Sequence, residues 1–120
     1  MSKLSDTVLS EFFGDFADMF LTGTGVPHIL VALKETTRDA VLVRVIGQME
    51  NDTRQGQTLG QAMTSTGKFP WLAWTTVHAG EQAGQLSESL GVLAEYFRRK
   101  SDMKKKMVWV VILVWKAIMT

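Results

Sequence analysis

Apolar side chains recur every three or four positions along most of the 120-residue chain, the spacing of amphipathic α-helices. Glycines and prolines separate these stripes at intervals that suit helix ends. No stretch alternates apolar and polar residues with the period of two that marks a half-buried strand, and no Asn-Gly hairpin dipeptide occurs. We therefore predict an all-α protein.

Capping residues and helix breakers divide the pattern into six helices. Small polar residues cap helix starts, proline suits the first turn, and glycine tolerates the left-handed conformation that ends a helix. The expected starts are Ser5 or Asp6, Pro27, Thr37 or Arg38, Thr58, Phe69-Pro70 and Leu86. The expected ends are Gly23-Thr24-Gly25, Gly56, Gly67 and the turn between Gly80 and Gly84.

Short connections between the expected helices favour antiparallel neighbours. We predict a six-helix antiparallel bundle, in which the last helix continues through a lysine-rich segment into an apolar tail. Trp71 and Trp74 are expected either inside the bundle or at an interface with a partner. The predicted core residues are Phe16, Leu30, Val45, Leu72, Leu90 and Leu93.

The composition is that of one folded domain, with 46% apolar residues, enough for a packed core. Thirteen basic residues balance 12 acidic ones, and the net charge of +1 is not the basic excess of a nucleic-acid-binding domain. Because the chain has no cysteine, it has neither a disulfide framework nor a thiolate metal site.

The C-terminal tail differs from the rest of the chain. Three lysines precede an apolar run at residues 107–115, which Lys116 interrupts. A basic flank and paired tryptophans are typical of the cytoplasmic end of a membrane span, although a complete span needs about 20 apolar residues. We assign residues 1–106 to a helical domain and 107–120 to the start of a truncated transmembrane helix. The alternative is an apolar helix end that packs against a partner copy.

The motifs of several common enzyme classes are missing from the sequence. Gly67-Lys68 is not a phosphate-binding loop, because Phe69 stands where the magnesium-binding hydroxyl belongs. His28 and His78 are the two histidines, and neither has a partner at zinc-binding spacing. No serine lies in a Gly-x-Ser-x-Gly turn. We predict that the protein is not an enzyme.

Glu81 and Glu88 flank a glycine-containing turn and give a weak metal-site signal. A calcium-like cation prefers carboxylate oxygens, but the spacing is not that of an EF-hand. The alternative is that these charges stabilise a helix start. In that case we expect Glu81 to accept hydrogen bonds from the first amides of the sixth helix. Gly80 and Gly84 are expected to allow close helix approach and to end the fifth helix.

Four short motifs and a basic segment follow one another along the chain. The motifs are Leu21-Thr22-Gly23-Thr24-Gly25-Val26-Pro27, Gly56-Gln57-Thr58-Leu59, Phe69-Pro70 and Gly80-Glu81-Gln82-Ala83-Gly84-Gln85-Leu86. The basic residues are Arg98, Arg99, Lys100, Lys104, Lys105 and Lys106. In order and spacing, this set resembles the F-domain family of type II secretion and type IV pilus platform proteins, over about residues 12–106.

The resemblance implies the first cytoplasmic domain of a bacterial inner-membrane platform protein. It implies contacts with a secretion ATPase, with other platform components and with pilin or pseudopilin, and a role in coupling ATP-driven movement to their assembly. Self-association is expected, and neither a cofactor nor a nucleic acid is. The basic residues are expected to face anionic lipid, at about 1 kcal/mol each.

Two other functions stay open at this point. The chain is alternatively a soluble helical adaptor or regulatory protein with no membrane role, whose apolar tail packs into a partner. It is alternatively a small helical enzyme, with a pocket holding a perturbed acid or base near Glu81 or His78.

Overall fold

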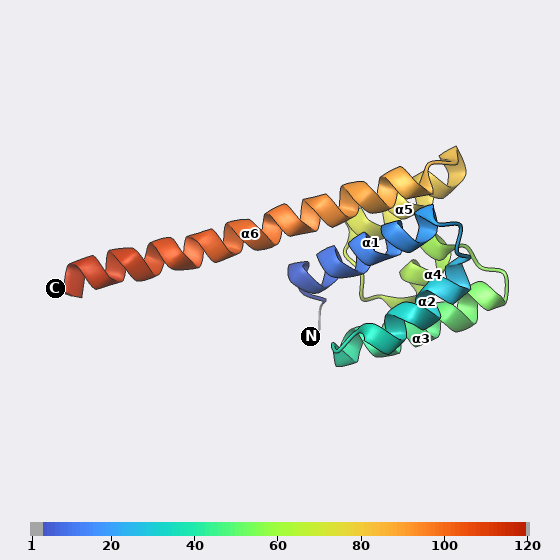
Figure 1. Cartoon of the computed structure of the whole chain (residues 1–120), viewed down its shortest axis with the longest axis horizontal. Coiled ribbons are helices and arrows are strands. Elements are labelled where there is room, and N and C mark those ends of the chain that lie inside the picture. The colour runs from blue at the N-terminus through green and yellow to red at the C-terminus, as the bar shows by residue number, and fades with distance from the viewer. Residues whose placement is uncertain (1–3, 120) are drawn as a thin grey trace.

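The structure, a computed structural model, describes residues 4–119, which form six α-helices and no strand (Figure 1). The all-α class and the number of helices are therefore confirmed for this range. The first expected domain begins with residues 1–3 and the second ends with residue 120, and these four residues lie outside the described range. The helices are α1 (Asp6–Leu21), α2 (Val26–Thr36), α3 (Ala40–Arg54), α4 (Leu59–Thr66), α5 (Trp71–Ala83) and α6 (Leu86–Met119).

Local capping chemistry sets most of the helix ends. The Ser5 hydroxyl accepts a hydrogen bond from the Val8 amide and so caps α1. Thr58 forms a capping box with Gln61, which satisfies two amides at the start of α4. Gly67 ends α4 in the left-handed conformation, at φ 65°. These ends agree with the boundaries expected from the sequence.

The start of α3 differs from the expectation of Thr37 or Arg38. The helix begins at Ala40, because the Asp39 carboxylate accepts a hydrogen bond of 2.9 Å from the Leu42 amide and acts as the N-cap. Thr37 instead caps the end of α2, with its amide donating to the Leu33 carbonyl.

An aromatic cluster joins α1 to the rest of the core. Phe13 on α1 stacks on Phe97 of α6 with ring centres 6.1 Å apart, and Phe69 packs beside both Phe12 and Phe13. Five of the six predicted core residues are buried. They are Phe16, Leu30, Val45, Leu90 and Leu93.

The sixth predicted core residue, Leu72, is only partly buried, and Trp71 is 69% exposed. The buried face of α5 is the stripe of Ala73, Val77 and Gly80, spaced four and three residues apart. Leu72 lies at the edge of this stripe, and Trp71 lies outside it. Leu72 is therefore a core residue only in part, and of the two positions expected for Trp71 the one inside the bundle is wrong.

Helix α6 is by far the longest, and its C-terminal half extends beyond the other five helices (Figure 1). It gives the molecule its extents of 61 × 28 × 24 Å. The N-terminal half of α6 runs antiparallel to α1, since Thr7 contacts Ser101 and Ser10 contacts Ala94. An antiparallel arrangement of the whole bundle stays a prediction.

Across residues 4–119, the structure contains no helix with a stretch both long and apolar enough to cross a membrane. The apolar run at residues 107–115 lies between lysines, which shortens it. The span expected from residue 107 onward is therefore not found.

Candidate functional site

The motif at residues 80–86, called here the glutamate-containing motif because it includes Glu81, lies at the junction of α4, α5 and α6. The two carboxylate oxygens of Glu81, near the end of α5, accept hydrogen bonds of 2.8 and 2.9 Å from the Leu59 and Gly60 amides. These amides belong to the first turn of α4, where backbone N–H groups have no acceptor within their own helix. Glu81 therefore binds a helix start, as expected, but that of α4 and not α6.

Two glycines allow the helices to approach at this junction. A Cβ atom on Gly60 would lie 2.9 Å from the Glu81 carboxylate and 3.2 Å from the His78 Cα. A Cβ atom on Gly80 would lie 2.8 Å from the Ser89 Cβ, on α6. Both contacts are too short for a side chain, so glycine sets the spacing of α4 and α6 against α5.

The other motif residues lie at helix boundaries. Gly25 is the N-cap of α2, with Pro27 in the first turn, and Pro70 is the N-cap of α5. Gly84 ends α5 in the left-handed conformation, at φ 70°. Two further motif positions are Gly56, which has a φ of 98° after α3, and Leu86, which is partly buried at the start of α6.

Glu88, the second expected metal ligand, is exposed on α6. Among residues 4–119, no three His, Cys, Asp or Glu side chains are grouped so that they could hold a metal ion. Both oxygens of Glu81 already accept backbone amides. A cation held by Glu81 and Glu88 stays a prediction, which a calcium-dependent rise in Tm, lost in Glu88→Gln, would test.

A second set of contacts fastens α6 where it leaves the bundle. Asp6, at the start of α1, pairs with Lys104 at 2.5 Å and lies 3.9 Å from Lys100. The Thr7 and Ser101 hydroxyls share a hydrogen bond of 2.6 Å. These partners lie more than 90 residues apart in sequence, so no local pattern indicated these contacts.

The predicted basic residues form a collar on the exposed surface of α6, just before its tail. Arg98 and Arg99 hydrogen bond to Glu95 and, with their positive charge, lower the pKa of that carboxyl to about 2. The other members are Lys100, Lys104, Lys105 and Lys106, all exposed. After the collar, every residue from 107 to 119 is exposed, including Trp109 and Trp115.

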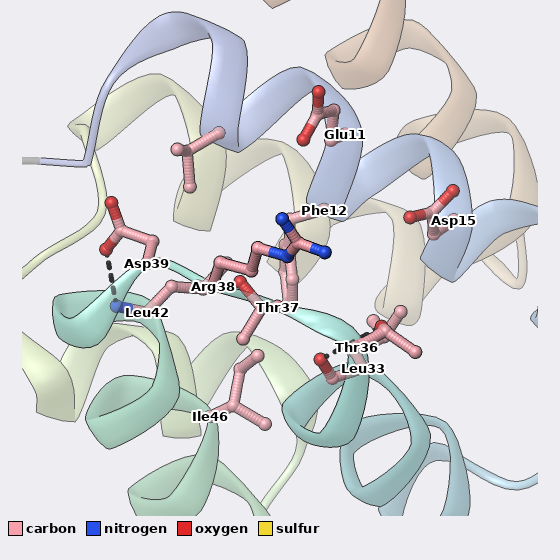
Figure 2. A pocket seen from close by; sticks show the side chains of 11 residues that line it. Glu11, Phe12, Asp15, Leu33, Thr36, Thr37, Arg38, Asp39, Leu42 and Ile46 are labelled. Carbon is pink, nitrogen blue, oxygen red and sulfur yellow. Dashed lines mark hydrogen bonds between the residues drawn. The ribbon is translucent and has the colours of Figure 1, made fainter.

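A cleft of ≈ 370 Å³ lies on the opposite side of α1 from α6, between α1, the end of α2 and the start of α3. Figure 2 shows Glu11 and Asp15 on α1 facing Arg38, which extends toward α1 from the α2–α3 connection. Sequence reasoning missed this cleft, because its three walls come from separate helices.

Comparison with known proteins connects this arrangement to a family. Residues 12–112 match the family "Type II secretion system (T2SS), protein F". The chain belongs to the type II secretion system protein F family. The match begins within α1, includes α2 to α5 and ends in the tail of α6. Members of this family are inner-membrane platform proteins of a structural kind and are not known as enzymes.

The chain is also similar to a curated relative, the type IV pilus assembly protein PilC of Pseudomonas aeruginosa. The two are 26% identical over 96 residues, which make up 80% of this chain and 26% of PilC. The chain therefore spans about a quarter of that relative's length. The resemblance noted in the sequence is confirmed at the level of the family.

Proposed function

We propose that the chain is a helical module of the inner-membrane platform of a type IV pilus or type II secretion machine. In this role it couples a cytoplasmic secretion ATPase, and other platform components, to the assembly of pilin or pseudopilin. The observation that carries the proposal is the protein F family match over residues 12–112. The name of the PilC relative supports a role in pilus assembly.

The geometry suits a module that transmits movement. Packed helices deform little under load, and α6 is one continuous helix of 34 residues, about 50 Å long at 1.5 Å per residue. Its first half is clamped by α1 and α5, while its second half extends past them. A displacement of the bundle would therefore be carried along α6 to its tail.

We propose that the α6 tail enters the membrane from the cytoplasmic side. All side chains at residues 107–119 are exposed, and most of them are apolar. The collar lysines immediately before them would lie among anionic headgroups, since basic residues favour the cytoplasmic side of a membrane. Lys116 would lie at a depth where a charged side chain costs about 2.5–3.5 kcal/mol on insertion scales.

A gene deletion tests the platform role. In the organism that carries this gene, deletion should abolish surface pili in electron micrographs or the export of a secreted protein, and the full-length gene should restore it. Normal piliation and secretion in the deletion strain would contradict the proposal. Copurification of the chain with the cognate secretion ATPase tests the coupling partner.

Liposome flotation tests the membrane contact. The chain should float with vesicles that contain anionic lipid, and a variant that ends at Lys106 should float less. Vesicles of neutral lipid are the control, because they test whether the basic residues of the collar contribute to the binding. The chain could instead fail to float with vesicles and self-associate in solution through its tail. That result would favour the alternative of a soluble adaptor, in which the tail packs into a partner.

A further inference from the structure

The cleft beside α1 has a concave, apolar floor (Figure 2). The floor is formed by Phe12 from α1, Leu33 from α2, and Leu42 and Ile46 from α3, all buried. Its volume of ≈ 370 Å³ falls in the range of pockets that hold a ligand or a partner's side chain. Because the floor comes from three helices, its shape depends on how α1, α2 and α3 pack together.

The walls of the cleft carry a net negative charge. Glu11 and Asp15 line the α1 side, and Arg38 is the one basic residue among the lining positions. Helix α1 adds Asp18 one turn further on and contains no lysine or arginine from Asp6 to Leu21. Desolvation and the neighbouring Asp18 raise the pKa of Asp15, in keeping with the excess of negative charge on this wall.

The fourth charged residue that lines the cleft is Asp39, whose carboxylate is less available for an ion pair with a partner than those of Glu11 and Asp15. Its carboxylate accepts the Leu42 amide at the start of α3. A bound partner would therefore meet two carboxylates from α1, those of Glu11 and Asp15, and one guanidinium, that of Arg38. The charge of the cleft favours a cationic partner, and its floor favours an apolar one.

We propose that this cleft binds a short protein segment in which one apolar side chain is flanked by lysine or arginine. The apolar side chain lies on the floor beside Phe12 and Leu42, and a flanking cation pairs with Asp15 or Glu11. Arg38 lies across from these carboxylates and competes with the incoming cation. An acidic segment would meet two like charges on α1, so the cleft discriminates by sign.

The probe is the capped tripeptide Arg-Trp-Arg, titrated into the full ¹⁵N-labelled chain in a neutral detergent and followed by amide chemical shifts. Shifts should concentrate at the amides of Glu11, Thr37 and Leu42, and be absent at Thr64 and Ser65 on α4. Capped Glu-Trp-Glu and Arg-Gly-Arg are the control peptides, and both should bind more weakly. Because binding is measured on the purified chain, its outcome is independent of pilus assembly or secretion.

Matched variants test the charge argument. The double variant Glu11→Gln with Asp15→Asn should weaken Arg-Trp-Arg binding by about 2- to 30-fold, the effect of removing two exposed ion pairs. Arg38→Gln should strengthen it. Glu35→Gln removes an exposed carboxylate of α2 outside the cleft and should leave binding unchanged. The Tm of each variant shows that it is folded.

Several results would overturn the proposal. These are equal binding of Arg-Trp-Arg and Glu-Trp-Glu, shifts concentrated outside the cleft, and no shifts at millimolar peptide. Equal weakening by Glu35→Gln and by the double variant would also overturn it, because the effect would then come from overall charge.

Discussion

Replacing Glu81 with glutamine should destabilise the junction of α4 and α5. In the wild type, each carboxylate oxygen accepts one amide from the first turn of α4. Glutamine has the same shape but only one acceptor oxygen, so its NH₂ group would face a backbone amide, donor against donor. The variant therefore keeps one neutral hydrogen bond and loses one that was made to a charged group.

The expected loss follows from these contacts. A hydrogen bond to a charged group contributes about 1.5–3 kcal/mol, and interaction with the helix dipole about 0.3–1 kcal/mol. Since Glu81 is half-buried, water replaces part of the lost interaction. We expect Glu81→Gln to lower the free energy of unfolding by about 1.5–3 kcal/mol, or the Tm by about 5–12 °C for a chain of this length.

Urea unfolding followed by far-UV circular dichroism measures this loss. Glu88→Gln is the matched control, because it removes an exposed carboxylate from α6 and should change stability by less than about 0.5 kcal/mol. Hydrogen exchange adds a local readout, since the Leu59 and Gly60 amides should exchange faster in Glu81→Gln. Equal stabilities of the two variants, or unchanged exchange at these amides, would refute the reasoning.

Four further outcomes are expected. Leu90→Ala should cost about 2–5 kcal/mol in urea unfolding because Leu90 is fully buried, and Leu72→Ala should cost clearly less; equal costs would contradict the assigned burial. The ordinary Glu95 pKa of 4.5 falls to about 2 beside two arginines, so its ion pairs stabilise the fold above pH 4.5 and are lost as the pH falls toward 2; Glu95→Gln should flatten that part of the pH–Tm curve, and an unchanged curve would argue against these pairs. Asp6→Asn should speed hydrogen exchange near the α6 exit and cost about 1 kcal/mol, whereas unaltered exchange would mean that the contact does not fasten α6. Deleting residues 107–120 should raise solubility and leave the Tm unchanged, since residues 107–119 are exposed, and a molten deletion variant would place the tail in the core.

The glutamate-containing motif shows where sequence reasoning about the site stopped. Its composition indicated that Glu81 binds a helix start, because a carboxylate is the natural partner of unpaired amides. The helix it binds is α4, 21 residues earlier, and no local pattern encodes that pairing. The cleft beside α1 was equally hidden, since Glu11 and Arg38 meet only after α1 and the α2–α3 connection pack together.

The sequence by itself determined the six helices of residues 4–119 and most of their ends. Those features depend on interactions within a few residues, such as the Ser5 and Thr58 caps and the left-handed Gly67. Only the tertiary structure decided which face of α5 is buried, which helix Glu81 caps, and that Asp6 fastens α6 as it leaves the bundle. The physical reason is range: caps and periodicity act along one helix, whereas burial and ion pairing depend on neighbours that the fold brings from distant parts of the chain.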